Sequence, residues 1–449
     1  MYKSRKFYFN LTTLLPLVLL ALVSGCSPTE TPQGTLTTPI SGSENKNQAS
    51  ASTVTKPNLP LTVAPENPDP TINNQALQYI KSLGAKQFHG VWIQSEDKLL
   101  ANQQGTVPLP AASITKVATS LITLQKFGPE HRFITQIGTT GEIQDGVLQG
   151  DLVFQGDQDP FFVWEEAMAV GNVLNKMGIK QVAGDLVIVD KFYMNYKTNP
   201  EIAGKLLKTA LNSKTWNAEA TTLHRALPPG TPKPQVIISG SVKALDAPPD
   251  NVKPLVRHSS FPIAELLKKM NKYSNNYMAE MLANSVGGAK VVAQKAAETA
   301  GVPTKEIQLV NGSGLSPQNK ISPRAATALF RAIENYLKPY NMTIADVFAV
   351  VGEDKGILSP RPLPQLAVVK SGSLNNVSAL AGALPTKNQG TVWFAIMNSG
   401  GNFEAFRKQQ EIFLNNAVRE WGSVATSPSE LIASPQRKDK TSTSEIVMR

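Results

Sequence analysis

The sequence predicts an α+β fold in which an antiparallel sheet lies between helical layers. Three observations support this prediction. Three strand patterns near the C-terminal end follow one another closely and lead into an amphipathic helix at 403–421. A helix and a hairpin stand near the N-terminal end, and helical patterns dominate much of the chain between these two regions. Terminal helices would cover one face of the sheet, and the helical region would cover the other.

The N-terminal residues 1–25 have the pattern of a secretory signal peptide, with a basic start, an apolar stretch at 11–23 and small residues after it. The apolar stretch is too short to be a firm membrane span. Cys26 follows directly and is the only cysteine of the chain, so no disulfide can form within the chain. Residues 22–26 resemble a bacterial lipoprotein box, which implies a lipid on Cys26 and attachment to a membrane in the cell envelope. An ordinary signal peptide with an incidental cysteine is the alternative.

The segments at both ends of the mature chain are rich in small and polar residues. Residues 26–70 contain too little apolar surface to offset the entropy of ordering, so we expect a flexible linker. Residues 425–449 have a similar composition and are expected to form a flexible tail.

The formal net charge is +10, which suits an anionic cell envelope. Nucleic acid is not an expected partner, because the chain is exported and its Lys and Arg residues are scattered. The four histidines have no paired ligand spacing, and no Gly-rich phosphate loop is present. We therefore expect neither a metal nor a cofactor.

The elements before the first motif have clear boundaries. Residues 71–83 form a helical pattern that Gly84 stops, and 89–94 with 98–101 form a hairpin pattern. A helix with a continuous apolar stripe begins after Pro110 and ends at Gly128. It is apolar enough to be the buried central helix of its domain, and its first turn would favour developing negative charge.

A separate block at 139–240 contains three strand patterns and one helix pattern, which predicts a β-rich inserted domain. The catalytic domain would then be discontinuous, with parts at 71–138 and 241–424. In its second part we expect helices at 262–270 and 277–286, and then strands at 366–373, 377–384 and 391–397.

Three short motifs occur in order. Ser113 and Lys116 lie three residues apart and therefore share one face of the helix. Ser274-Asn-Asn276 falls on the predicted turn between two helices, and Lys370-Ser-Gly372 falls at the end of a predicted strand. Each motif alone fits a helix cap with a surface lysine, a polar turn or a strand end. The joint order S-x-x-K, S-x-N, K-[ST]-G makes an acyl-transfer site the better interpretation.

This order resembles penicillin-binding proteins and serine β-lactamases, above all the D-alanyl-D-alanine carboxypeptidase and endopeptidase family typified by penicillin-binding protein 4. Residues 127–133, 150–160, 184–190 and 311–316 also match that family, and the likeness spans about 75–420. Lys-Ser-Gly replaces the commoner Lys-Thr-Gly, Asn and Pro replace an Asp and an Arg around the fourth stretch, and the inserted block is short. The resemblance implies a penicillin-binding, β-lactamase-like transpeptidase fold.

Acyl transfer assigns a role to each catalytic candidate. Ser113 would be the nucleophile, and Lys116 could act as its base if its pKa falls well below about 10.4. The charge of Lys370 across the cleft would help to lower that pKa. Ser274 could relay a proton between Lys116 and the leaving nitrogen, and Asn276 could hold the substrate amide and a lysine.

The third motif is expected to bind substrate. Lys370 and Ser371 would bind the terminal carboxylate of a D-Ala-D-Ala ending, on the strand that also carries Gly372. The backbone N–H of Ser113 and, as the resemblance implies, that of Ser373 would form the oxyanion hole.

The resemblance implies a serine-type D-Ala-D-Ala carboxypeptidase or endopeptidase that trims peptidoglycan peptides in the periplasm and binds β-lactam antibiotics. A serine β-lactamase is an alternative, but Glu165 and Glu166 lack the context of the class A loop that positions water. A non-catalytic envelope-binding protein of the same fold is a third hypothesis, and the complete motif set argues against it.

Overall fold

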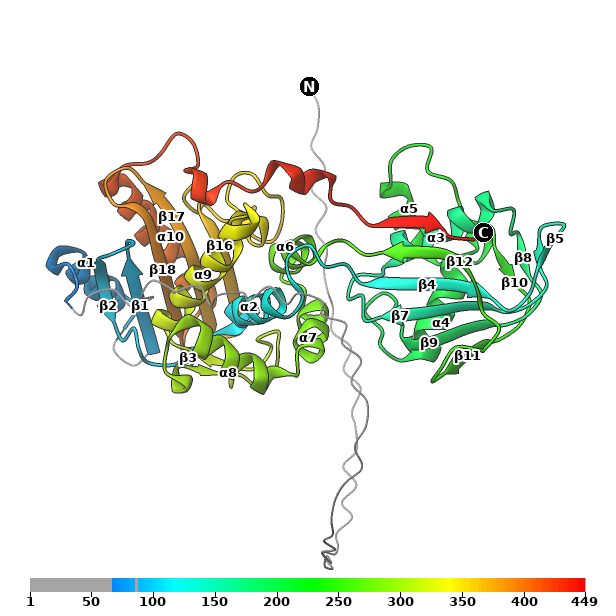
Figure 1. Ribbon diagram of the computed structural model, residues 1–449. Coiled ribbons are helices and arrows are strands. Elements are labelled where there is room, and N and C mark those ends of the chain that lie inside the picture. Colours follow the sequence, from blue (N-terminus) through cyan, green and yellow to red (C-terminus); the bar gives the residue numbers. More distant parts are fainter. Residues whose placement is uncertain (1–66, 85–87, 449) are drawn as a thin grey trace, which may run out of the picture. The chain divides into compact units, whose positions relative to one another are not determined.

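The computed structural model of the protein describes residues 67–84 and 88–448 (Figure 1). The expected signal peptide, Cys26 and nearly all of the expected linker at 26–70 lie outside these residues. Within the described part of the chain, no helix combines the length and apolar character needed to cross a membrane.

The main module is built on a six-stranded antiparallel sheet with the order β15-β16-β17-β18-β1-β2. Its central strand β17 is buried along its whole length, because its side chains alternate between two hydrophobic cores. Ala379 and Ala381 face one core, and Leu380 and Leu384 face the other. The strands are β1 (Phe88–Gln94), β2 (Leu99–Gln103), β15 (Ala349–Val350), β16 (Val368–Leu374), β17 (Val377–Thr386) and β18 (Gly390–Ser399).

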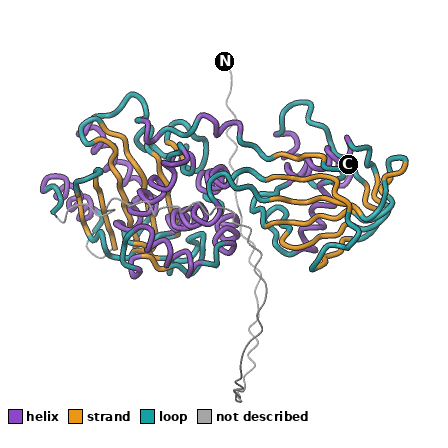
Figure 2. Tube along the Cα trace, viewed as in Figure 1, coloured by secondary structure: helices purple, strands orange, loops and turns teal. Residues whose placement is uncertain are grey.

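Helices cover both faces of this sheet, which confirms the predicted α+β layering (Figure 2). The terminal helices α1 (Pro70–Ser82) and α10 (Phe403–Trp421) pack on one face. The helices of the other core are α2 (Thr115–Phe127), α6 (Ile263–Tyr273), α7 (Asn276–Ser285), α8 (Ala289–Ala300) and α9 (Pro323–Leu337). A small sheet on this side joins β3 (Leu109–Pro110), β14 (Lys320–Ile321) and β13 (Ile307–Gln308).

Helix α2 is the buried central helix that the apolar pattern predicted. All ten of its residues from Thr115 to Leu124 are buried, polar ones included. A short 3₁₀ turn at Ala112–Ile114 precedes it and carries Ser113, so the nucleophile candidate stands one turn before the α-helix proper.

The inserted module is wider than the expected block at 139–240. Its six-stranded sheet has the order β11-β9-β7-β4-β12-β19, and both β4 (Ile134–Thr139) and β12 (Lys253–Ser259) belong to it. Ile137 and Val256 also lie in its hydrophobic core. The module therefore runs from 134 to 259, because strands that leave and re-enter the main module pair with each other. Its other elements are β5 (Ile143–Gln144), β6 (Val147–Leu148), β7 (Leu152–Asp157), α3 (Trp164–Lys176), β8 (Gln181–Val182), β9 (Leu186–Lys191), α4 (Pro200–Ala210), α5 (Ala218–Ala226), β10 (Ile237–Ile238) and β11 (Val242–Leu245).

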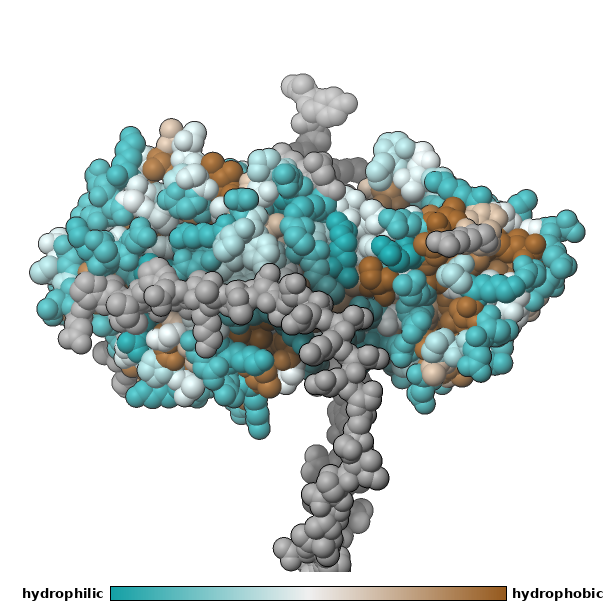
Figure 3. Space-filling view, in the orientation of Figure 1, coloured by the Kyte–Doolittle hydropathy of each residue, from teal (hydrophilic) through white to brown (hydrophobic). Residues whose placement is uncertain are grey.

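In the expected flexible tail at 425–449, residues 443–446 form a strand, and Leu431 packs in the core of the main module. Strand β19 (Thr443–Ile446) pairs antiparallel with β12, with Ile446 opposite Val256. Backbone hydrogen bonds hold this polar strand in place, so composition alone could not reveal it. Apolar residues gather on part of the inserted module in Figure 3. Ile446 and Met448, near the end of the chain, are exposed.

Candidate active site

The structure brings Ser113 and Lys116 into direct contact, as their spacing predicted. The Lys116 ammonium nitrogen lies 2.9 Å from Ser113 Oγ. Ala112, just before the nucleophile candidate, has φ of 46°, a left-handed conformation that costs a residue with a Cβ about 1–2 kcal/mol. Such strain persists only where the surroundings enforce it, and Ala112 is completely buried.

Lys116 is the chemical centre of the site. Its side chain is 0% exposed, and its Nζ also donates to Asn276 Oδ1 at 2.7 Å and to the Ser313 carbonyl at 2.6 Å. Burial lowers the pKa of Lys116 from 10.5 to about 7, and the Glu280 carboxylate opposes part of this shift. As a neutral amine it has two N–H groups, which match the two carbonyl oxygens. Its lone pair is then free to accept the proton of Ser113.

The second motif forms the junction between α6 and α7, close to the predicted turn. Ser274 ends α6 in the left-handed conformation with φ of 53°. Asn275 caps the next helix by accepting the Met278 N–H at 3.0 Å, and Asn276 is the first residue of α7. This tight junction places Ser274 beside Lys370 and Asn276 beside Lys116.

The third motif lies on β16, and Lys370 reaches the second motif from there. Its Nζ donates to Ser274 Oγ at 3.1 Å and to the Ser371 carbonyl at 2.7 Å. Burial, and then the nearby Lys116, hold the pKa of Lys370 well below its ordinary value. Burial is the main cause of the low Lys116 pKa, and the repulsion between the two lysines is seen in the lowered pKa of Lys370.

Gly372 allows β16 to lie against the nucleophile turn. A Cβ at this position would come within 2.8 Å of both the Ala111 carbonyl oxygen and the Ser113 nitrogen. The ladder between β15 and β16 ends at Val369, so within the described part of the chain the motif residues have no strand partner on that edge. Ser373 follows on β16, and its hydroxyl accepts a hydrogen bond from Arg407 Nη2 at 2.7 Å. The motif strand therefore stands directly beside Ser113.

Lys268 is another buried lysine of the main module, but it is paired with a carboxylate. This buried residue of α6 donates to the Ala345 carbonyl at 2.8 Å and pairs with Asp354 at 2.6 Å. A carboxylate partner stabilises the charged form of a lysine. Among the described residues, the hydrogen-bond partners of Lys116 Nζ are a hydroxyl and two carbonyl oxygens, and no carboxylate.

Sequence reasoning missed the Ser313 carbonyl as a partner of Lys116. A backbone carbonyl has no signature of its own, because any residue can supply one. The only signal was the glycine-rich run at 311–316, which we expected to be a structural loop near the cleft.

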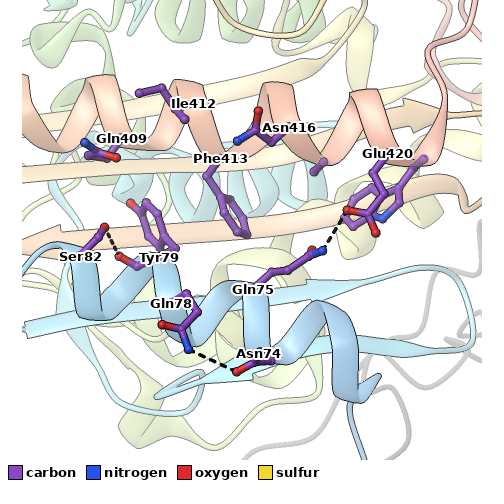
Figure 4. Close-up of a pocket in the computed structure, with 12 residues that line it drawn as sticks. Asn74, Gln75, Gln78, Tyr79, Ser82, Gln409, Ile412, Phe413, Asn416 and Glu420 are labelled. Atoms are coloured by element: carbon purple, nitrogen blue, oxygen red, sulfur yellow. Dashed lines mark hydrogen bonds between the residues drawn. The ribbon is translucent and has the colours of Figure 1, made fainter.

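A groove between α1 and α10 is separate from this site. Its volume is about 380 Å³, and the residues in Figure 4 line it. The groove lies on the sheet face opposite α2, and polar contacts such as Gln75 Nε2 to Glu420 Oε2 at 2.9 Å cross it. None of the three motifs contributes to its lining.

Comparison with known proteins agrees with this geometry. The model of the D-Ala-D-Ala carboxypeptidase 3 (S13) family matches residues 74–204 and 233–417. D-alanyl-D-alanine carboxypeptidase DacB of Haemophilus influenzae is 23% identical over 417 residues, covering 70% of this chain and 86% of the relative.

Two solved structures share the fold. Penicillin G-acylated Bd3459, a predatory endopeptidase from Bdellovibrio bacteriovorus, superposes with a TM-score of 0.63 at 21% identity, covering 79% of this chain and 99% of that one. Penicillin binding protein 4 from Haemophilus influenzae gives 0.58 at 20% identity, covering 78% and 100%. The family match spans most of the chain and both modules. The protein therefore belongs to the D-Ala-D-Ala carboxypeptidase 3 (S13) family.

Proposed function

We propose that this protein is a serine-type D-Ala-D-Ala carboxypeptidase and endopeptidase that trims peptidoglycan peptides through an acyl-enzyme on Ser113. The observation that carries the proposal is the buried Lys116 beside Ser113, with a pKa of about 7. Family membership supports the substrate class, and the acylated relative supports penicillin as a ligand.

Acylation begins with Ser113 Oγ attacking the carbonyl of the penultimate D-Ala while Lys116 Nζ takes the hydroxyl proton. Backbone N–H groups of Ser113 and Ser373 stabilise the oxyanion. The tetrahedral intermediate collapses as the C–N bond breaks. The proton on Lys116 is then passed to the leaving amine, with Ser274, whose hydroxyl accepts from Lys370 Nζ at 3.1 Å, as the proposed relay. Lys116 is neutral again at the end of this step.

Deacylation repeats the chemistry with water as the nucleophile. Lys116 removes a proton from the water, the ester bond to Ser113 breaks, and the serine oxygen takes the proton back. The same steps cleave a terminal D-Ala or a cross-link, because both present an amine as leaving group. Asn276 holds the substrate amide and orients Lys116 throughout.

The test uses a pentapeptide ending in D-Ala-D-Ala and a labelled penicillin in parallel. We expect release of free D-Ala together with a penicillin adduct that persists. Rapid turnover of penicillin without D-Ala release would favour a β-lactamase instead. Glu166, a candidate for such turnover, lies in the inserted module 3.5 Å from His258 Nε2 and is not among the hydrogen-bond partners of Ser113.

Lys370 is proposed to bind the terminal carboxylate with Ser371. An incoming carboxylate would stabilise the charged form of this buried lysine. A charge-assisted hydrogen bond contributes roughly 1.5–3 kcal/mol, so Lys370→Ala should lower kcat/KM on free D-Ala-D-Ala termini about 10- to 100-fold. Lys387→Ala, an exposed lysine at the far end of the same sheet, is the matched control.

Amidating the substrate carboxylate should weaken wild type far more than Lys370→Ala. Steady-state kinetics with both substrates measures this difference. Equal losses in the two proteins would mean that Lys370 serves another purpose, such as tuning Lys116.

The proposal places the enzyme in the periplasm, held to a membrane by lipid on Cys26. The sequence pattern at 1–26 supports this localisation. Stable attachment needs more than one acyl chain, since a single chain binds only marginally. Cys26→Ala should move active enzyme to the soluble envelope fraction, as measured by fractionation and penicillin labelling. An unmodified cysteine or a different start in the mass of the native protein would contradict the anchor and leave the catalytic proposal intact.

A further inference from the structure

The run 311–316, which we call the positioning loop, is fixed from two sides beside Lys116. On one side, the Glu280 carboxylate of α7 accepts hydrogen bonds from two backbone N–H groups of the loop. These are Gly312 N at 3.0 Å and Ser313 N at 2.9 Å. A carboxylate that accepts two N–H groups makes charge-assisted bonds, which are stronger than neutral ones.

On the other side, α2 donates to the carbonyl oxygens of the same two residues. Thr119 Oγ1 donates to the Gly312 carbonyl at 2.8 Å, and Lys116 Nζ donates to the Ser313 carbonyl at 2.6 Å. Lys116 and Thr119 are three residues apart and share a face of α2. The position of the Ser313 carbonyl, one of the two oxygens that orient the Lys116 amine, thus depends on Glu280.

The spacing between two residues on α7 connects the second motif with the positioning loop. Glu280 is four residues after Asn276, so both side chains project from one face of the helix. One turn of α7 presents Asn276 to Lys116, and the next presents Glu280 to the positioning loop. Gly312 makes the close approach possible, because a Cβ there would lie 2.3 Å from Ala283 Cβ.

We propose that Glu280 is a positioning residue for acyl transfer, which holds the Ser313 carbonyl so that the free lone pair of Lys116 faces Ser113. None of the three motifs contains this residue. The inference rests on the proposed roles of Ser113 and Lys116, and its test separates the two.

The charge of Glu280 also affects a measurable quantity, the pKa of Lys116. Burial lowers the Lys116 pKa and Glu280 raises it, and Lys370 is a further ionisable group beside Lys116, with a pKa itself lowered by burial and by Lys116. Removing the carboxylate should lower the Lys116 pKa further. The neutral amine would then persist to lower pH, and the acidic limb of the acylation profile should move to lower pH.

The experiment measures the second-order rate of penicillin acylation against pH in the full-length protein. Glu280→Gln keeps the side-chain shape, but its amide can accept only one of the two N–H groups. We expect its plateau rate to fall about 10- to 100-fold from misplacement, with the acidic limb displaced to lower pH. Glu280→Asp keeps the charge but has a shorter side chain. Its plateau acylation rate should therefore fall, while the acidic limb of its pH profile should stay close to that of wild type. Glu298→Gln, an exposed glutamate on α8, is the matched control and should behave as wild type.

Wild-type rates and an unmoved limb in Glu280→Gln would overturn the inference. A lower plateau rate in both Glu280 variants, with the acidic limb at the wild-type pH in both, would also overturn the inference. A purely structural loss gives that result. Glu280→Asp provides the test should Glu280→Gln not fold, because a wild-type plateau in the aspartate variant would exclude a positioning role. Labelling that survives in Ser113→Ala would instead show that the proposed site is wrong.

Discussion

Replacing Ser113 with alanine should abolish both penicillin labelling and D-Ala release. The hydroxyl next to Lys116 is the proposed attacking atom, and within the described residues it is the only hydroxyl that Lys116 Nζ contacts by a hydrogen bond. Deleting the nucleophile of a serine peptidase lowers kcat on the order of 10⁶-fold, which is below detection in either assay. Gel-based labelling with fluorescent penicillin and chromatography of free D-Ala measure the two losses.

Ser429→Ala is the matched control, because that serine is exposed and its hydroxyl donates to the neighbouring Glu430 at 3.3 Å. It should label as wild type does. Ser113 is half-buried, and its alanine variant should unfold at close to the wild-type temperature. Labelling of Ser113→Ala at the wild-type rate would refute the assignment.

Lys116→Ala should have the second largest effect, a loss of about 10²–10⁴-fold in acylation rate, the usual contribution of a general base. Wild-type acylation should rise as pH increases through about 7, because only the neutral amine can accept the serine proton. In Lys116→Ala, the acylation rate should no longer rise with pH in this range. Stopped-flow acylation across pH 5–9 tests both statements.

Lys126→Ala, an exposed lysine at the end of the same helix, is the control for Lys116. Lys116→Met preserves more of the buried volume and should show the same kinetic defect if the alanine variant is unstable. An acidic limb that persists unchanged in Lys116→Met would assign the titrating group elsewhere.

Much of the main module could be predicted from the sequence because its elements are local and strongly patterned. The expected helix at 403–421 is α10, and the hairpin at 89–94 and 98–101 is β1 and β2. The motif order also predicted that Asn276 would hold a lysine, and Asn276 Oδ1 accepts from Lys116, which is far away in the chain. The contact of Lys370 with Ser274 was not predicted.

The boundaries that failed depend on pairing between distant segments. Strand β12 has no clear alternation of apolar residues, and its partner β4 lies more than a hundred residues earlier. Strand β19 is short and polar, and its pairing partner β12 lies almost two hundred residues earlier in the chain. A period of two in the sequence indicates a half-buried strand, so an exposed edge strand leaves little trace.

The parts of the site that the sequence did not reveal are backbone groups and their supports. The Ser313 carbonyl carries no side-chain signal, and Glu280 looked like an ordinary helix residue. Its spacing from Asn276 gains meaning only when α7 is seen to face both Lys116 and the positioning loop. Three-dimensional proximity supplied that information.

The most direct test of the account is mass spectrometry of the wild-type protein after brief exposure to penicillin. We predict one intact penicillin added to the proteolytic peptide that contains Ser113, with fragmentation placing it on that serine. The adduct should be absent from Ser113→Ala. An adduct on any other residue, or D-Ala release from a protein that forms no adduct at all, would contradict the acyl-enzyme on Ser113.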